Sequence, residues 1–386
     1  MKFAGRYYLD HNAQSPLSSS LKEWLSRGDL FLSNADSRHL SGQKSKSLVS
    51  AAADYLNRLF NPQNAFDLVF HSGATEGLGG ISRSLLLRMP NAPFYYLIFD
   101  HAVAQGISER ESSHRPVRKF LGDPLTGIWS EADLHEIKQS QAPAFVHWTW
   151  INNESSAIAS LALAIELKKN NSELFISVDA AQAIGREFAP GPLPTELDAY
   201  TFSGHKFGSL PGVGFSFINR RHSPLSWSEG GGQSKWRSGT LNVPGIHSLQ
   251  LALADLQAGF NSETLKKIHH QFTNFFSNEF PLVRDLGRTF PTRAHNCLFL
   301  HFPNIPNDRL LMALSLAGLD VSAGSACHSG SSLPNRVAMA LGLDEAQAKD
   351  LLRISWDYRL LESDLPEILG LFKTTLHNLG LGRERS

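Results

Sequence analysis

One of the two cysteines in this 386-residue chain lies in a segment with almost no bulky neighbours. The segment is SAGSACHSGSS, residues 322–332, and its cysteine is Cys327. A structural free cysteine is usually buried among apolar residues, whereas glycine, alanine and serine favour an accessible loop. His328 is placed to lower the pKa of the thiol, although adjacent loop residues need not touch. We therefore expect a reactive thiol at Cys327 and, inside HNCLFLHF, a core residue at Cys297.

A lysine follows an apolar run in the segment SGHKFGSLPGVG, residues 203–214. Lys206 has His205 and Ser203 beside it and glycines around it, which suggests a confined site. Confinement lowers the pKa of a lysine and gives a neutral amine that can form a Schiff base. The alternative is a solvated loop lysine, which is what most lysines are.

Two further candidates stand at the ends of apolar runs. Asp179 closes the run SVD, where a carboxylate is costly to desolvate unless it meets a cation or several donors. It is either the partner of a protonated heterocycle nitrogen or the N-cap of a helix beginning at Ala180. His101 follows FYYLIFD and is either catalytic or, as is commoner for a lone histidine, structural.

The stretch FHSGATEG, residues 70–77, follows an apolar run and opens a helical pattern. Main-chain N–H groups at that helix start, with the hydroxyl of Thr75, would form a cup suited to a phosphate. The commoner alternative is an ordinary helix N-cap by Ser72 or Thr75.

Five apolar runs predict the buried strands that position these residues. Helical patterns such as residues 160–170 lie between them, and this alternation predicts an α/β domain with a mainly parallel sheet. Ligands bind at the carboxyl ends of such strands, so the polar residues that follow the runs are expected to face one pocket. The five runs are residues 67–73, 94–100, 144–150, 174–180 and 199–204.

Composition excludes several classes of protein. The 36 basic and 36 acidic residues cancel, so no field recruits nucleic acid or an acidic membrane, and a small substrate is expected. Two cysteines exclude a disulfide framework and a multi-cysteine zinc site, whereas a single bridge between them stays open. No signal peptide or membrane span is recognised, which predicts a cytoplasmic protein. A composition shift after residues 230–245 predicts a second, smaller domain.

Taken together, the motifs resemble those of the NifS/IscS-type cysteine desulfurases, pyridoxal-phosphate (PLP) enzymes of the class V aminotransferase group. The likeness runs in the same order along nearly the whole chain. Its most specific part is SGHK with VDAAQ before it and the RSGT segment after it. The motifs are YLDHNAQSP, SGATEG, DHAV, NNE, VDAAQAIG, SGHKFGSLPGVG, GGGQSKWRSGTLNVPGI, SAGSACHSG and LRISWDY.

The resemblance implies the PLP-dependent transferase fold type I, of class α/β. A large domain, 16–246, would contain a mainly parallel seven-stranded sheet, and a smaller α/β domain, 1–15 and 247–386, would carry the cysteine loop. Lys206 would hold PLP covalently, Asp179 would pair with the ring nitrogen, and His101 would stack on the ring and handle protons. The other implied residues are Ala74, Thr75, Ser203 and His205 near the phosphate, Gln182 at the phenolic oxygen, Asn153 and Arg353 at the substrate carboxylate, and Thr240, contributed across the interface of a homodimer.

The implied reaction converts L-cysteine to L-alanine and leaves the sulfur as a persulfide on Cys327. A sulfur-acceptor protein would then take it, for iron–sulfur cluster assembly or for tRNA thiolation. Housekeeping members carry a longer C-terminal tail that docks the iron–sulfur scaffold, so the acceptor stays open. Two alternatives remain: a selenocysteine lyase or other PLP-dependent β-lyase or aminotransferase, and a non-catalytic PLP-fold binding partner.

Three positions depart from the usual motifs. Ser156 stands in NNESSA where glycine is expected, and it would be strained if that turn has positive φ. Gln14 stands in NAQSP where small threonines are usual, so it would alter the pocket wall. After SGATE comes GLGG in place of a polar continuation, which would loosen the helix start. These departures predict an altered substrate fit or partner.

Overall fold

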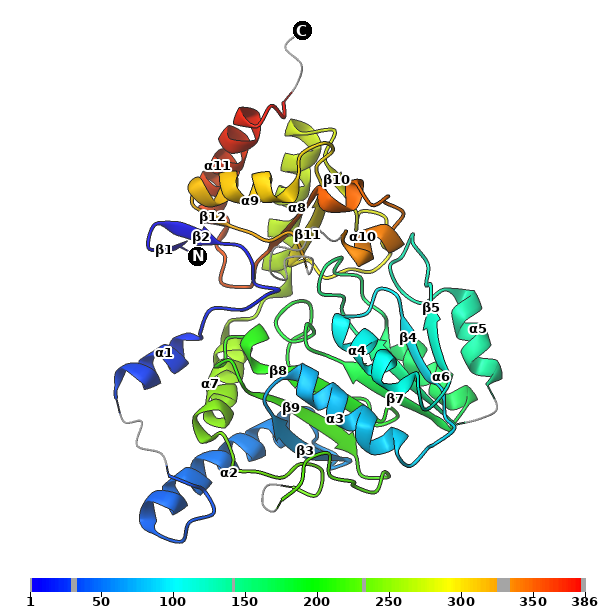
Figure 1. Ribbon diagram of the computed structural model, residues 1–386. Coiled ribbons are helices and arrows are strands. Elements are labelled where there is room, and N and C mark those ends of the chain that lie inside the picture. The colour runs from blue at the N-terminus through cyan, green and yellow to red at the C-terminus, as the bar shows by residue number, and fades with distance from the viewer. Residues whose placement is uncertain (1, 29–32, 141–142, 231–233, 325–333, 383–386) are drawn as a thin grey trace.

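The computed structural model describes residues 2–28, 33–140, 143–230, 234–324 and 334–382. Cys327 and His328 lie outside the described residues. The described chain forms one large sheet and two small ones, with helices packed around them (Figure 1).

A seven-stranded, mainly parallel sheet forms the larger part of the structure. Six strands share one direction, and β9 is antiparallel to both of its neighbours. The predicted α/β fold with a mainly parallel seven-stranded sheet is therefore confirmed. In sheet order the strands are β3 (Phe66–His71), β9 (Gly214–Asn219), β8 (Ala199–Ser203), β7 (Leu174–Asp179), β6 (Ala144–Thr149), β4 (Phe94–Leu97) and β5 (Val117–Phe120).

All five predicted strands are present, and β4 differs most from its expected length because it ends at Leu97. The Asp100 carboxylate accepts the N–H of Leu97 at 2.7 Å, and the N–H of Asp100 donates to the carbonyl of Leu97 at 2.9 Å. This turn takes the chain out of the sheet and places His101 at the start of a helix.

Helices cover both faces of this sheet (Figure 1). Neighbouring residues of β6 show the alternation: Phe145 packs in the cluster under α3 and α4, and Val146 packs in the larger cluster on the other face. The predicted helix 160–170 is confirmed as α6, with Ser160 as its N-cap. The helices of this part are α1 (Ser19–Ser26), α2 (Leu40–Phe60), α3 (Ala74–Leu86), α4 (Ala102–Glu111), α5 (Glu131–Gln139), α6 (Leu161–Asn170) and α7 (Val243–Gly259), with the 3₁₀ turn η1 (Gly204–Lys206).

Two three-stranded sheets, with a hydrophobic cluster of their own, form the remainder. This cluster joins Tyr7 to Phe272 and Leu352, and Figure 1 shows the first strands beside β12 and α9. The elements are β1 (Lys2–Phe3), β2 (Arg6–Tyr8) and β12 (Leu319–Asp320) in one sheet, β10 (Arg284–Asp285), β11 (Cys297–His301) and β13 (Leu351–Ser355) in the other, helices α8 (Ser262–Glu279), α9 (Asn307–Leu316), α10 (Arg336–Ala340) and α11 (Leu365–Asn378), and the 3₁₀ turns η2 (Gln347–Lys349) and η3 (Glu362–Asp364).

The predicted domain boundary after residue 246 falls inside α7. Buried residues of this helix, including Leu249 and Leu256, belong to the cluster of the large sheet. The division into 16–246 and 1–15 with 247–386 therefore stays a prediction.

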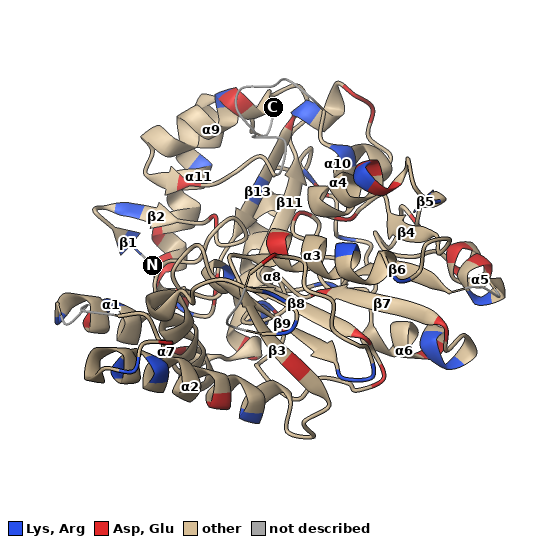
Figure 2. Ribbon diagram, turned by 60° about the horizontal axis from the view of Figure 1, so that its bottom comes forward, with Lys and Arg blue, Asp and Glu red and all other residues tan. Residues whose placement is uncertain are grey.

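Charged residues of both signs lie interspersed over the helices (Figure 2). Within the described ranges, no helix combines the length and the apolar character that crossing a membrane requires.

The glycine-rich continuation of SGATE does not interrupt helix α3, which runs from Ala74 to Leu86. A Cβ atom at Gly77 would lie 2.5 Å from Nε2 of the buried His71, and one at Gly80 would overlap the ring of Trp227. These glycines therefore make room for two bulky neighbours that pack against the helix.

The turn after β6 requires the strained conformation that the sequence suggested at Ser156. The side-chain oxygen of Asn152 accepts the N–H groups of Glu154 and Ser155, each at 2.9 Å, and Ser156 follows with a φ of 62°. A side chain with Cβ is disfavoured there, and the Ser156 hydroxyl gains only a long contact of 3.5 Å to the carbonyl of Cys297.

We expect Ser156→Gly to raise the free energy of unfolding by about 1 kcal/mol, because glycine removes the strain of positive φ. Thermal unfolding measured by circular dichroism checks this. The control is Ala157→Gly, at a buried neighbour whose φ is not positive, which should lower the melting temperature. A Ser156→Gly protein that melts below the wild type would contradict the strain.

Candidate active site

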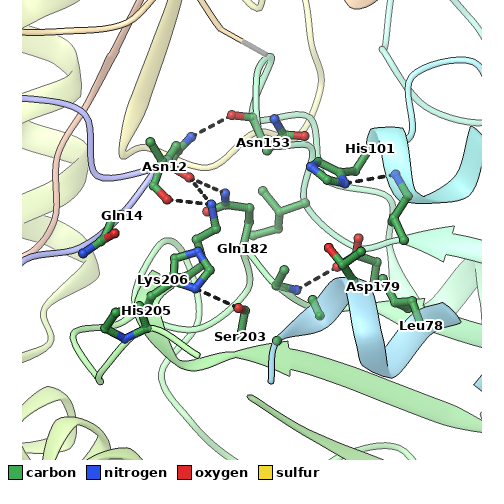
Figure 3. A pocket seen from close by; sticks show the side chains of 18 of the residues that line it. Asn12, Gln14, Leu78, His101, Asn153, Asp179, Gln182, Ser203, His205 and Lys206 are labelled. Atoms are coloured by element: carbon green, nitrogen blue, oxygen red, sulfur yellow. Dashed lines mark hydrogen bonds between the residues drawn. The ribbon is translucent and has the colours of Figure 1, made fainter. Parts of the chain in front are cut away.

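A pocket of about 610 Å³ opens at the carboxyl ends of β6, β7 and β8, beside the start of α3 (Figure 3). Polar side chains reach this edge of the sheet from three segments that follow strands: the turn at Leu97, the loop after β6 and the Lys206 turn. The carboxyl ends of parallel strands meet at one edge, which brings these segments together. The structure thereby brings together ten of the residues singled out in the sequence: Ala74, Thr75, His101, Asn153, Asp179, Gln182, Ser203, His205, Lys206 and Arg353.

Lys206 lies in the turn η1, directly after β8. Its Nζ donates to the main-chain oxygens of Asn12 at 2.6 Å and of Ala13 at 2.9 Å. Burial, together with the positive charges of Arg353 and Arg186, lowers the pKa of Lys206 to about 7. The residue is not a solvated loop lysine: near neutral pH much of it is the neutral, nucleophilic amine.

Asp179 ends β7 with its carboxylate in the pocket. No helix begins at Ala180; the carboxylate instead accepts the N–H of Ala181 at 3.0 Å across a turn. Burial raises the pKa of Asp179 and outweighs the opposing effects of His147 and Lys206. A cation placed against this carboxylate would relieve that penalty.

The first turn of α3 leaves its N–H groups available for an anion. The N-cap position is Gly73, and no side chain caps the helix, so the alternative of capping by Ser72 or Thr75 is wrong. Beside this turn, the Ser203 hydroxyl and Nδ1 of His205 are hydrogen-bonded at 3.0 Å. These groups form the cup for a phosphate that the sequence suggested.

His101 is both a structural residue and part of the pocket wall. Its Nδ1 accepts the N–H of Val103 at 3.2 Å and caps α4. Burial and the charge of Lys206 lower the pKa of His101 to about 4, so its imidazole is neutral at neutral pH. Because Nδ1 accepts a hydrogen bond, the ring proton is on Nε2.

Arg353 enters the pocket from β13, on the opposite side from the large sheet. Its guanidinium bonds the Asp10 carboxylate at 2.8 Å and the carbonyl of Asn153 at 3.0 Å. Nε is buried and has no hydrogen-bond partner among the described residues. Arg353 lines the pocket, where its guanidinium would attract a ligand carboxylate.

Comparisons with known proteins agree with this geometry. A family model described as aminotransferase class V matches residues 7–360. The chain belongs to the class V aminotransferase family. It is 28% identical to a protein of Mycobacterium tuberculosis named IscS-like cysteine desulfurase, with 94% of each chain covered, and 27% identical to a Bacillus subtilis protein named putative cysteine desulfurase IscS 1, with 91% and 93% covered.

The fold is also that of solved members. A NifS-like protein from Rickettsia africae superposes with a TM-score of 0.84 at 24% identity, over 96% of this chain and 99% of that one. The predicted PLP-dependent transferase fold type I is thus confirmed.

Class V aminotransferases are PLP-dependent, and the pocket fits that cofactor. The uncapped start of α3 offers N–H groups for the phosphate. The neutral amine of Lys206 can bond the aldehyde carbon, and a protonated ring nitrogen would supply the cation that the buried Asp179 lacks.

One residue that the sequence assigned to the cofactor, Thr240, does not line this pocket. Thr240 lies in a small neighbouring cavity together with Ser72 and Gly212. Cys327 lies outside the described residues, whereas Ser322 and Gly324, shortly before it, line the pocket. Cys297 is fully buried in β11, where burial raises the pKa of its thiol to about 11, so its prediction as a core residue is confirmed.

The N-terminal segment builds more of the site than its motif predicted (Figure 3). The main-chain carbonyl of Asn12 accepts hydrogen bonds from Nζ of Lys206 and Nε2 of Gln182. The side-chain amide of Asn12 donates to the carbonyl of Asn153 at 3.1 Å. Gln14 lines the pocket, as its departure from the motif suggested. The available signal was the polar run DHNAQS directly after the short strand β2.

We expect Lys206→Arg to abolish covalent attachment of PLP while keeping the positive charge, because a guanidinium does not form a stable bond to the aldehyde. The measurement is the visible absorbance that remains after borohydride reduction and denaturing gel filtration. Lys168→Arg, at the partly buried lysine paired with Asp198, should retain the cofactor like the wild type. A covalent chromophore in Lys206→Arg would show that another lysine holds PLP.

Proposed function

We propose that this protein is a PLP-dependent cysteine desulfurase that carries sulfur as a persulfide on Cys327. The single observation that carries the proposal is one pocket lined by the neutral amine of Lys206, the carboxylate of Asp179 and the guanidinium of Arg353. The relatives named cysteine desulfurase cover nearly the whole chain, which supports the same reaction here.

The reaction balances without a further reactant. The C–S bond of L-cysteine breaks, an S–S bond forms to Cys327, and the thiol proton of Cys327 completes the methyl group of L-alanine. Cys327 thereby becomes the persulfide, and its sulfur is oxidised while the substrate carbon is reduced. An acceptor thiol on another protein then takes the terminal sulfur.

The chain's own residues have distinct tasks in this reaction. Bound PLP supplies the electron sink for the negative charge that develops at the substrate Cα. Arg353 would bind the substrate carboxylate through its guanidinium and fix which bond at Cα faces Lys206. The neutral amine of Lys206 would accept the Cα proton. His101, which lines the same pocket and is neutral, would offer its Nε2–H as a hydrogen-bond donor.

Reach supports the role of Cys327. Gly324 lines the pocket, and three residues of extended chain span at most about 11 Å. Covalent connectivity alone therefore keeps the Cα atom of Cys327 within about 11 Å of that of Gly324, a residue of the pocket wall.

The oligomer, location and acceptor are proposed on the same basis. We infer a cytoplasmic homodimer in which Thr240 reaches the phosphate of the other protomer. Its place beside Ser72 and Gly212, outside the pocket of its own chain, supports this assignment. The acceptor would belong to iron–sulfur cluster assembly or to tRNA thiolation.

We expect purified protein given L-cysteine and a thiol reductant to form alanine and sulfide in equal amounts. Cys327→Ala should lose alanine formation by a factor of a hundred or more, because no nucleophile then takes the sulfur. Cys297→Ala, which removes the buried cysteine, is the matched control and should keep the activity.

Other outcomes of that assay identify the alternatives. Undiminished alanine formation in Cys327→Ala would refute the persulfide mechanism on Cys327, and pyruvate and ammonia in place of alanine would point to another β-lyase. A much higher rate with selenocysteine than with cysteine would indicate a selenocysteine lyase. A colourless wild-type protein would favour a non-catalytic binding partner.

We expect Arg353→Lys to raise KM for L-cysteine at least tenfold with a smaller effect on kcat, because a lysine offers no fork for the carboxylate. Steady-state kinetics with L-cysteine and with its methyl ester measure the effect. The ester has no carboxylate charge, so its kcat/KM should change little in the variant. An equal loss with both substrates would contradict the role of Arg353 as a carboxylate clamp.

A further inference from the structure

Arg186 is a fully buried cation beside the pocket, to which neither the motifs nor the reaction assigns a role; it is 1% exposed. Its guanidinium donates to the main-chain oxygens of His11 and Lys206, the latter at 2.7 Å. It also donates to the hydroxyl of Ser15 at 3.2 Å and the side-chain oxygen of Gln182 at 3.3 Å. All four acceptors are uncharged.

Among the residues that the structure describes, no carboxylate forms a direct ion pair with this cation. Asp357 attracts Arg186 electrostatically, but its carboxylate lies 3.1 Å from Nδ1 of His11 and forms an ion pair with Arg359. Burial lowers the pKa of Arg186 to about 10, so it stays charged at neutral pH. Its field therefore acts on the neighbouring amine of Lys206.

The four acceptors belong to three segments that meet at Lys206. Ser15 fastens two of them further: its N–H donates to the carbonyl of His205 at 2.9 Å and its hydroxyl to the carbonyl of Lys206 at 2.8 Å. The same N-terminal segment supplies the oxygens of Asn12 and Ala13 that accept Nζ of Lys206. Arg186 thus bonds the main chain of Lys206 and also residues 11–15, the segment that the amine of Lys206 contacts.

We propose that Arg186 is a positioning residue for the reactive amine: its guanidinium fastens residues 11–15 to the Lys206 turn and so fixes where Nζ lies in the pocket. The inference deepens the proposed function and rests on Lys206 as the reactive amine. The inference goes beyond the proposed function because it assigns to the N-terminal segment, held by Arg186, the task of positioning the Lys206 amine.

The charge of Arg186 has a second consequence for the same amine. The charged groups that act on Lys206 are Arg353 and Arg186, which lower its pKa, and Asp10 and Asp179, which raise it. Removing Arg186 subtracts one of the two cations and loosens the packing that buries Nζ. Both changes raise the pKa of Lys206, so less of the amine is neutral at pH 7.

The test follows Lys206 itself in full-length protein freed of PLP. Reductive methylation by formaldehyde and cyanoborohydride, quantified at Lys206 by peptide mass spectrometry across pH, gives the midpoint of its titration. We expect a midpoint near 7 in the wild type. Arg186→Met should shift it upward by about one unit or more, since it removes the charge and the four hydrogen bonds. PLP should also leave the reconstituted Arg186→Met holoenzyme several-fold faster.

Two further variants distinguish the effect of the Arg186 charge from the effect of its hydrogen bonds, and both from the effect of losing any buried arginine. Arg186→Lys keeps the charge with fewer donors, so its midpoint should stay close to the wild type while PLP release quickens. Arg115→Met is the matched control: the side chain of Arg115 is also buried and donates to three main-chain oxygens, those of Leu86 at the end of α3 and of Met89 and Ala92 in the loop that follows. It should leave both readouts unchanged.

Equal midpoints and equal PLP release in Arg186→Met and the wild type would overturn the proposal. If Arg186→Met fails to fold, Arg186→Lys decides: wild-type retention of PLP there would overturn it. The titration needs neither PLP nor L-cysteine, so failure of the proposed desulfurase activity would be distinguished from failure of this inference.

Discussion

The site depends on a buried lysine amine, that of Lys206, whose pKa is low enough for it to lose its proton near neutral pH. Lys206 meets this constraint because its acceptors are the uncharged carbonyls of Asn12 and Ala13, while Arg353 and Arg186 supply positive charge nearby. A carboxylate in place of those carbonyls would hold the amine as an ammonium ion. The pocket instead orients Nζ with neutral groups and leaves its carboxylate, Asp179, for the cofactor.

This arrangement links the two parts of the fold. The segment after β2 pairs with β13 through Asp10 and Ser355, bonds Arg353 through the Asp10 side chain, and then passes over the Lys206 turn. The substrate clamp and the reactive amine, which come from different sheets, are thus held against one short stretch of chain. A shift of that stretch would move both groups together.

The departures from the family motifs lie around the site and spare the groups that would do chemistry. Ser156 has a positive φ in the turn that also brings Asn153 to the pocket. Gln14 lines the wall of the same pocket. Gly77 and Gly80 allow His71 and Trp227 to pack against α3. Such changes alter the shape and rigidity of the pocket while the amine, carboxylate and clamp stay in place.

The sequence by itself determined the α/β class, five of the seven strands of the large sheet and the residues gathered at their carboxyl ends. Apolar runs and polar residues after them are local signals, and the ordered motifs added the cofactor. Only the tertiary structure decided that Asp179 caps no helix, that Gly73 leaves α3 uncapped, and that Arg186 bonds Lys206. These outcomes depend on hydrogen bonds between segments far apart in the chain, whose pairing no local pattern encodes.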